Sequence, residues 1–151
     1  MNRKRADVPG AIPGARDSRP PIDVAAGLLF RHQRLLITQR LPGDHLGGLW
    51  EFPGGKREPA ETFEECLRRE LMEELGVEIA VQELFDSMTY VYPDKTVRLN
   101  FYRCRLEHHE PRALGCQALA WVKLAQLADY RFPPADEQLL RKLRGSPELW
   151  R

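Results

Sequence analysis

One stretch decides how this chain folds, and it reads GKREPAETFEECLRRELMEELGV over residues 55–77. Apolar side chains recur in it at four-residue spacing, at Phe63, Leu67, Leu71 and Leu75. This period predicts a helix from Thr62 to Gly76 that buries one apolar face. Thr62, followed three residues later by Glu65, matches the capping box that begins helices, and Gly76 suits a left-handed helix end.

Three carboxylates share one face of this helix because they fall at positions i, i+3 and i+4: Glu70, Glu73 and Glu74. Like charges this close destabilise a helix, and a bound cation would reverse that cost. Gly54 and Gly55 come just before the helix and can expose a backbone carbonyl to the same cation. Carboxylate and carbonyl oxygens favour Mg²⁺ or Mn²⁺ over zinc. A solvated acidic face, with Arg69 paired to Glu73, is the alternative that the helix alone supports.

The spacing of the whole stretch carries further information. Counted from Gly55, Glu61 follows after five residues and Arg69 after seven more, and the stretch ends in Glu73-Glu74-Leu-Gly76-Val. This pattern resembles the Nudix box at every defined position. The resemblance implies an α/β fold, namely an α/β/α sandwich with a central mixed β-sheet, in which the box forms a loop-helix-loop. It also implies hydrolysis of a nucleoside diphosphate linked to another group.

The resemblance assigns roles by motif position. The implied catalytic residues are Glu61, Arg69, Glu70, Glu73 and Glu74. The last three would bind Mg²⁺, or alternatively Mn²⁺, together with the carbonyl oxygen of Gly54 or Gly55. Arg69 would orient the glutamates by salt bridge, and Glu61 would support the metal shell. Metal ions neutralise phosphate charge and activate water, and a nearby glutamate would take the proton.

Residues outside the box resemble one branch of the family. Trp50 to Lys56 is similar to the approach strand of MutT-like enzymes, which convert nucleoside triphosphates to monophosphates and pyrophosphate. Phe132 to Ala135 also matches that branch. The implied substrate-binding residues are Arg40, His45, Phe52, Lys56 and Asp136. The expected substrate is therefore a nucleoside triphosphate of the 8-oxo-dGTP or the CTP/dCTP kind, with a role in cleaning the nucleotide pool.

Two positions depart from that branch. Asp136 stands where the enzymes that clear oxidised guanine nucleotides carry asparagine. An ionised aspartate only accepts hydrogen bonds, so it suits a base edge rich in N–H groups. It is equally well explained as a charge near the N-terminus of the last helix. Gly115 stands where the branch has a further metal-binding glutamate, and Glu107 and Glu110 are the nearest acidic candidates to replace it.

Two other functions stay open at this point. A hydrolase of another nucleoside diphosphate compound, such as a nucleotide sugar or a dinucleotide, would share the box. A non-catalytic recognition or regulatory module usually loses box residues, whereas this chain retains all of them. Retention favours the enzyme.

The composition narrows the function classes further. The chain has 151 residues, which suits one domain, and its net charge of +1 does not favour stable nucleic-acid binding. No apolar run approaches the roughly 18 residues of a membrane span. Three cysteines without C-x-x-C spacing predict reduced thiols in the cytoplasm, not disulfides or a zinc site. The sequence leaves the oligomeric state open.

The predicted organisation is a flexible leader over residues 1–21 and a Nudix hydrolase domain over 22–151. The leader holds four prolines and five basic residues, with little apolar periodicity. The expected strands are Ile22 to Phe30, Arg34 to Gln39, Leu49 to Phe52, Val77 to Val81, Leu84 to Tyr92, Thr96 to Leu106 and Leu119 to Val122. Asp136 to Leu143 is expected to form a closing helix.

Overall fold

Strand β1 (Ile22–Arg31) runs through the middle of the sheet and organises it. In the computed structural model, which describes residues 19–151, β1 pairs in parallel with β6 (Lys95–His108) along most of its length. Its far end turns back antiparallel into β2 (Arg34–Gln39). The predicted leader lies outside the described residues, except for its last three.

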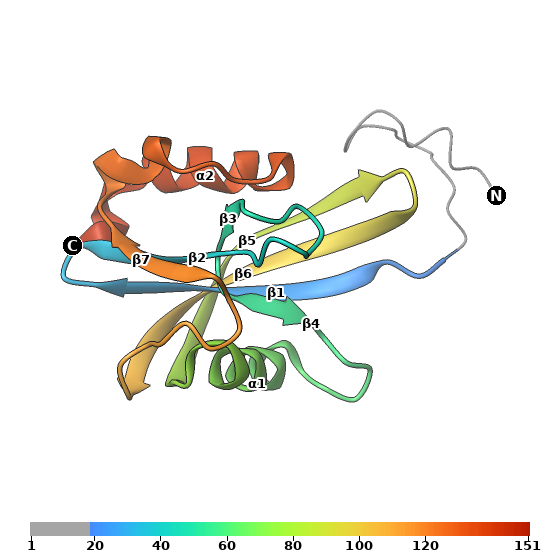
Figure 1. Cartoon of the computed structure of the whole chain (residues 1–151), viewed down its shortest axis with the longest axis horizontal. Helices are drawn as coiled ribbons and strands as arrows, with labels where there is room; N and C mark the ends of the chain where they lie inside the picture. Colours follow the sequence, from blue (N-terminus) through green and yellow to red (C-terminus); the bar gives the residue numbers. More distant parts are fainter. Residues whose placement is uncertain (1–18) are drawn as a thin grey trace.

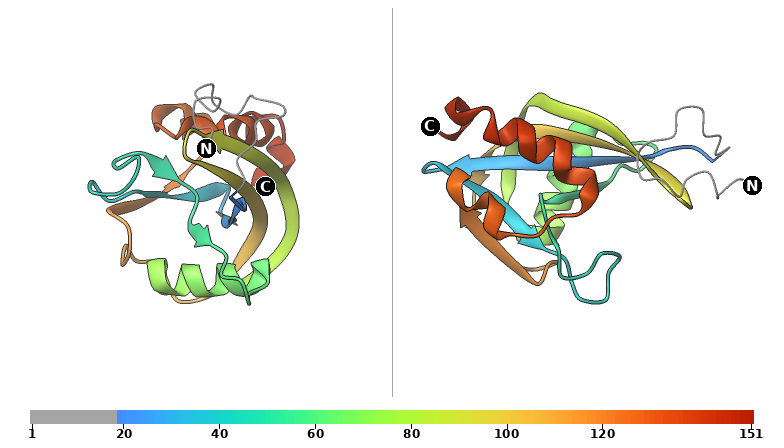
Figure 2. Two further views of the ribbon diagram at one scale, coloured as in Figure 1. Left: turned by 90° about the vertical axis from the view of Figure 1, so that its right-hand side faces the viewer. Right: turned by 90° about the horizontal axis from the view of Figure 1, so that it is seen from above.

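The remaining strands extend this centre on both sides. They are β3 (Trp50–Glu51), β4 (Gly54–Lys56), β5 (Glu78–Tyr92) and β7 (Ala118–Val122). The order is β3-β2-β1-β6-β5, with β4 paired to β1 and β7 paired to β2. The long β5–β6 hairpin curves strongly, as the two views of Figure 2 show. The predicted mixed sheet is confirmed.

Helix α1 (Phe63–Leu75) covers one face of the sheet (Figure 1). Both hydrogen bonds of the predicted capping box between Thr62 and Glu65 are present, and Gly76 ends the helix with φ of 70°. Its apolar face packs on β1, β4 and β5, where Phe63 is partly buried and Cys66, Leu67, Leu71 and Leu75 are fully buried. The predicted helix and its ends are confirmed.

Helix α2 (Glu137–Arg144) lies over the opposite face, preceded and followed by short 3₁₀ segments (Figure 1). Its buried residues Leu139 and Leu143 belong to a second core, which includes Phe52 and Phe101. Two cores on the two faces make the predicted α/β/α sandwich. In the part of the chain that the structure describes, no helix has the length and apolarity that a membrane span needs.

Two predicted strand boundaries were wrong. Val77 to Val81 and Leu84 to Tyr92, expected as separate strands, form the single strand β5. The interruption is only a pair of register shifts against β6, between Val81 and Leu84 and between Leu84 and Asp86. The short strand β4, which begins at Gly54 and pairs with β1, was also missed.

Candidate active site

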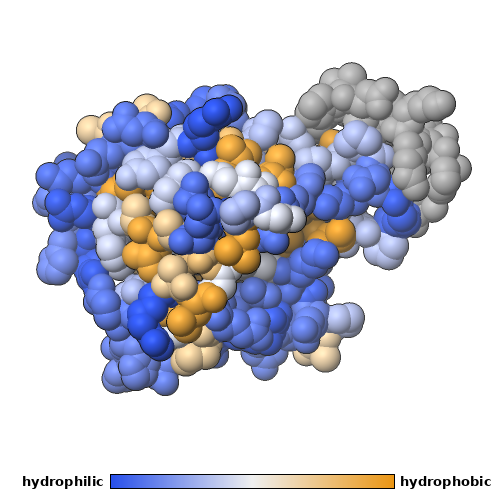
Figure 3. All heavy atoms as spheres, viewed as in Figure 1, coloured by the Kyte–Doolittle hydropathy of each residue, from blue (hydrophilic) through white to orange (hydrophobic). Residues whose placement is uncertain are grey.

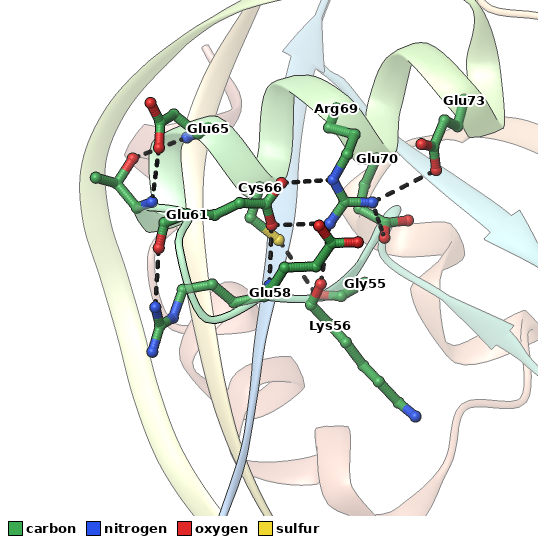
Figure 4. Close-up of polar contacts among 11 residues, drawn as sticks. Gly55, Lys56, Glu58, Glu61, Glu65, Cys66, Arg69, Glu70 and Glu73 are labelled. Carbon is green, nitrogen blue, oxygen red and sulfur yellow. Dashed lines mark hydrogen bonds and ion pairs between the residues drawn. The ribbon is translucent and has the colours of Figure 1, made fainter.

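Arg69 joins three of the predicted glutamates (Figure 4). Its Nε and Nη2 atoms donate hydrogen bonds of 2.5 and 2.9 Å to the two carboxyl oxygens of Glu61. Nη1 donates to Glu70 at 3.0 Å and lies 3.5 Å from a carboxyl oxygen of Glu73. The bonds from Arg69 lower the pKa of Glu61 to about 2, so this carboxylate is ionised at neutral pH.

The carboxyl group of Glu70 packs directly on Gly55. A Cβ atom at this position would overlap that carboxyl, so only glycine lets the Glu70 carboxyl group stay in this place. Cys66, on the same helix, is fully buried and directs its thiol to the Gly55 carbonyl oxygen at 3.6 Å. Burial raises the pKa of Glu70.

Glu74 is the box carboxylate that turns away from Arg69. Its Oε1 atom is buried and has no hydrogen-bond partner. Burial raises the pKa of Glu74 to about 8, and the charges of Glu51 and Glu70 act in the same direction. A buried carboxyl oxygen without a partner is costly, and a cation or a proton would stabilise it.

A pocket of about 360 Å³ opens beside Glu74. It lies between β1, β3, β4, the β5–β6 hairpin and the segment that precedes α2. Figure 3 shows apolar side chains gathered on the central part of this face of the molecule, with hydrophilic ones around them. The predicted site residues in its lining are Arg40, His45, Phe52, Gly54, Gly55, Lys56, Glu74 and Asp136. The other predicted residues, Glu61, Arg69, Glu70 and Glu73, form the Arg69 cluster outside that lining.

Phe52 and Lys56 occupy different parts of this pocket. Phe52 is almost fully buried, and its ring stacks on Phe132 with centroids 5.2 Å apart. It therefore forms a fixed wall. The side chain of Lys56 points away from the glutamates (Figure 4), while its carbonyl oxygen accepts a 3.1 Å hydrogen bond from Arg69.

Asp136 is 8% exposed, and its carboxyl group makes no hydrogen bond within the described chain. It stands just before α2, as predicted, but its side chain does not cap the helix. It lines the pocket instead. Burial raises the pKa of Asp136 to about 7, and the charge of Glu51 adds to the effect.

The residues of the pocket lining that sequence reasoning missed include Glu51, Tyr92, Lys95 and Cys116. The sequence could have indicated Glu51, because it lies between the aromatic residues Trp50 and Phe52. Successive side chains of a strand point to opposite faces, so Glu51 points to the face opposite to theirs. The two hairpin residues gave no local signal, since only the pairing of β5 with β6 brings them to the pocket.

The arrangement is thus a row of glutamates beside a pocket with one apolar wall and several charged groups. The model of the NUDIX domain family matches residues 25–142 of the chain. The protein belongs to the Nudix family.

Relatives place this Nudix protein in the MutT-like branch. The putative 8-oxo-dGTP diphosphatase 2 of Mycobacterium tuberculosis is 41% identical over 128 residues, which cover 82% of this chain and 91% of that protein. The CTP pyrophosphohydrolase of Escherichia coli is 36% identical over 119 residues, or 79% and 88% of the two chains. A structure of MutT, from work on Aliivibrio salmonicida and Vibrio cholerae, matches with a TM-score of 0.62 and 34% identity, covering 84% and 99%. The chain is a MutT-like Nudix hydrolase, so the reading as a non-catalytic module is set aside.

Gly115, the position that departs from the branch, lies against the end of the box helix. Its backbone N–H donates to the Glu74 carbonyl at 3.0 Å, and a Cβ atom there would sit 3.3 Å from the Glu74 Cα. Glu107 pairs with Arg105 and Glu110 pairs with Arg31, and neither lines the pocket. Gly115 thus packs the loop before β7 onto the helix.

The Nudix box offers chemistry that fits a divalent cation. Nudix hydrolases generally use such a metal, and oxygen ligands suit hard cations. Two features of this chain agree: the buried Glu74 oxygen without a partner, and the close approach of Glu70 to Gly55. As the side chains stand, no three His, Cys, Asp or Glu residues among 19–151 are grouped to hold an ion. Arg69 instead contacts Glu61, Glu70 and Glu73.

Proposed function

We propose that this protein is a Mg²⁺-dependent nucleoside triphosphate pyrophosphohydrolase that removes unwanted nucleotides from the cytoplasmic pool. The observation that carries the proposal is that Gly55 and Glu74 belong both to the Nudix box and to the pocket lining, and that Gly54, just before the box, lines the pocket as well. A ligand in the pocket therefore lies beside Glu74, the box glutamate that lines it. The names of the relatives, 8-oxo-dGTP diphosphatase and CTP pyrophosphohydrolase, support this substrate class.

The proposed metal ligands are Glu70, Glu73, Glu74 and a carbonyl oxygen of Gly54 or Gly55. When bound, the metal supplies charge neutralisation at the phosphate oxygens and lowers the pKa of a bound water. Mn²⁺ has the same preference for oxygen and is expected to replace Mg²⁺. Arg69 holds the carboxylates from the outer side, and its bidentate bond to Glu61 keeps its guanidinium in one orientation.

The reaction adds water to the triphosphate and breaks the bond between the α- and β-phosphates. The products are nucleoside monophosphate and pyrophosphate. The proposed ligands of the phosphates and the sugar are Arg40, His45 and Lys56, which all line the pocket. The net charge of the whole chain is only +1, which does not favour binding of nucleic acid. We therefore propose free nucleotides as the partners of these side chains.

The base would lie between the wall formed by Phe52 and the carboxyl group of Asp136. Asp136 makes no hydrogen bond to any other residue among 19–151, so its oxygens are available to N–H groups of a base. Cytosine and adenine offer an amino group, and guanine offers an adjacent N–H pair. CTP-like substrates and oxidised guanine nucleotides are therefore the two kinds to compare first.

A direct test measures pyrophosphate release from natural and oxidised nucleoside triphosphates with Mg²⁺. Turnover of at least one is expected, and Glu74→Gln should lower that rate by about two orders of magnitude or more. Glu64→Gln is the matched control, since this exposed residue of the same helix pairs only with Arg68. No turnover of any nucleotide by the folded protein would refute the proposal.

A further inference from the structure

Glu51 is a carboxylate of the pocket to which neither the box nor the relatives assign a role. It sits on β3, where it pairs with Thr38 of β2, so its backbone is fixed by the sheet. Its side chain is 23% exposed, and one carboxyl oxygen accepts a 2.7 Å hydrogen bond from Nη1 of Arg40. Burial raises the pKa of Glu51, and Arg40 counteracts this effect.

Arg40 is held from two directions. Its Nε donates to the carbonyl oxygen of His45 at 2.6 Å, which ties it to the loop between β2 and β3. The Arg40 backbone also bonds to Gly48 and Leu49 at 3.1 and 2.9 Å across the base of the same loop. An arginine has five N–H donors, so three of them remain for a ligand in the pocket.

Glu51 lies electrostatically between the two ends of the pocket. Its charge raises the pKa of Asp136 at the proposed base end and the pKa of Glu74 at the box end. The charge of Arg40 acts in the opposite sense on all three carboxyl groups. Arg40 is therefore a cation whose charge acts on three acids, and among them it is hydrogen-bonded to Glu51.

We propose that Glu51 is a positioning residue for substrate. Its hydrogen bond to Arg40 prevents this arginine from pairing with Asp136 or Glu74. The remaining N–H groups of Arg40 then stay directed toward the nucleotide. The inference rests on the proposed function. In the absence of the Glu51 charge, Arg40 is left to the attraction of other pocket carboxylates, among them Asp136 and Glu74, which the base and the metal need. Removal of the charge should thus weaken substrate binding more than it slows turnover.

Glu51→Gln keeps the size of the side chain and removes its charge. The expected result is a KM for the best nucleoside triphosphate raised about tenfold, with kcat at saturating Mg²⁺ and nucleotide changed less than about threefold. Glu83→Gln serves as the matched control, because its 2.9 Å pair with Arg103 also joins neighbouring strands but lies outside the pocket. The control should leave KM unchanged.

A double-mutant cycle separates positioning from general structure. If Glu51 acts through Arg40, then Glu51→Gln has no further effect on KM once Arg40→Gln is present. Additive effects, an unchanged KM, or a fall in kcat equal to the fall in kcat/KM would overturn the inference. If Glu51→Gln does not fold, Glu51→Asp carries the same test, since it keeps the charge but shortens its reach.

The two proposals fail in different ways. Absence of turnover by the wild-type protein refutes the proposed function. Turnover by the wild type, together with normal KM in Glu51→Gln, refutes only the role of Glu51.

Discussion

The carboxyl group of Glu70 fills the space where a side chain at Gly55 would lie. This contact joins β4 to α1, and it places the backbone of the loop against the row of glutamates. Glu70 is held there by Arg69, which donates to it at 3.0 Å. The Glu70 carboxylate can therefore keep this position only while residue 55 has no side chain.

Gly55→Ala is predicted to remove most of the activity. The added Cβ would displace the Glu70 carboxyl group, and with it the bond to Arg69, so kcat should fall about a hundredfold. Gly43→Ala is the control, because a Cβ there meets no atom within 4 Å. Steady-state rates and thermal unfolding of both variants check this, and a Gly55→Ala protein with normal kcat would contradict it.

Arg69→Lys is predicted to lower activity although the charge is kept. A lysine cannot form the bidentate bond to Glu61 while also contacting Glu70 and Glu73. We expect kcat/KM to fall about tenfold to a hundredfold and the Mg²⁺ concentration at half-maximal rate to rise. Arg68→Lys, in an exposed pair with Glu64, should do neither. Equal behaviour of the two variants would show that the guanidinium fork is not needed.

The helix was predictable because its signals are local. The apolar spacing, the Thr62 cap and Gly76 all act within the helix itself, and α1 follows them closely. The short strands β3 and β4 were harder, since two or three residues carry no period of their own. Glycines normally interrupt strands, but Gly54 approaches the Ala25 carbonyl so closely that pairing with β1 needs it.

The pocket was predictable only in part, for the same physical reason. Arg40, His45 and Asp136 came from likeness to the branch, and all three do line one pocket. Tyr92 and Lys95 arrive there through the β5–β6 hairpin, whose register depends on bulges that no short motif reveals. The prominence of Glu51 follows from burial and from its neighbours, which are properties of the folded chain alone.

Asp136 is predicted to make stability depend on pH. Its folded-state pKa of about 7 lies above the ordinary value of 3.8, so the folded chain holds a proton that the unfolded chain has lost. The free energy of unfolding should therefore fall as pH rises from about 4 to 7. Asparagine does not titrate, so the Asp136→Asn protein does not lose this free energy. Its free energy of unfolding relative to that of the wild type should therefore rise by on the order of 2 to 3 kcal/mol between pH 5 and pH 8. Urea unfolding in EDTA measures it, and parallel profiles for the two proteins would contradict the prediction.

Asp136→Asn is also predicted to change the base preference. Above its pKa of about 7 the Asp136 carboxyl group is ionised and only accepts hydrogen bonds, whereas an asparagine amide both donates and accepts. The kcat/KM of the variant should rise for bases that present a carbonyl oxygen beside an N–H group. It should fall for bases that present only N–H donors to this position. A shift of about tenfold in the ratio of kcat/KM between oxidised dGTP and CTP is expected, since one buried hydrogen bond changes partner. The competing explanation, that Asp136 only provides charge at the start of α2, predicts lower stability at neutral pH and an unchanged ratio. The ratio and the unfolding curve measured on one preparation therefore decide between the two.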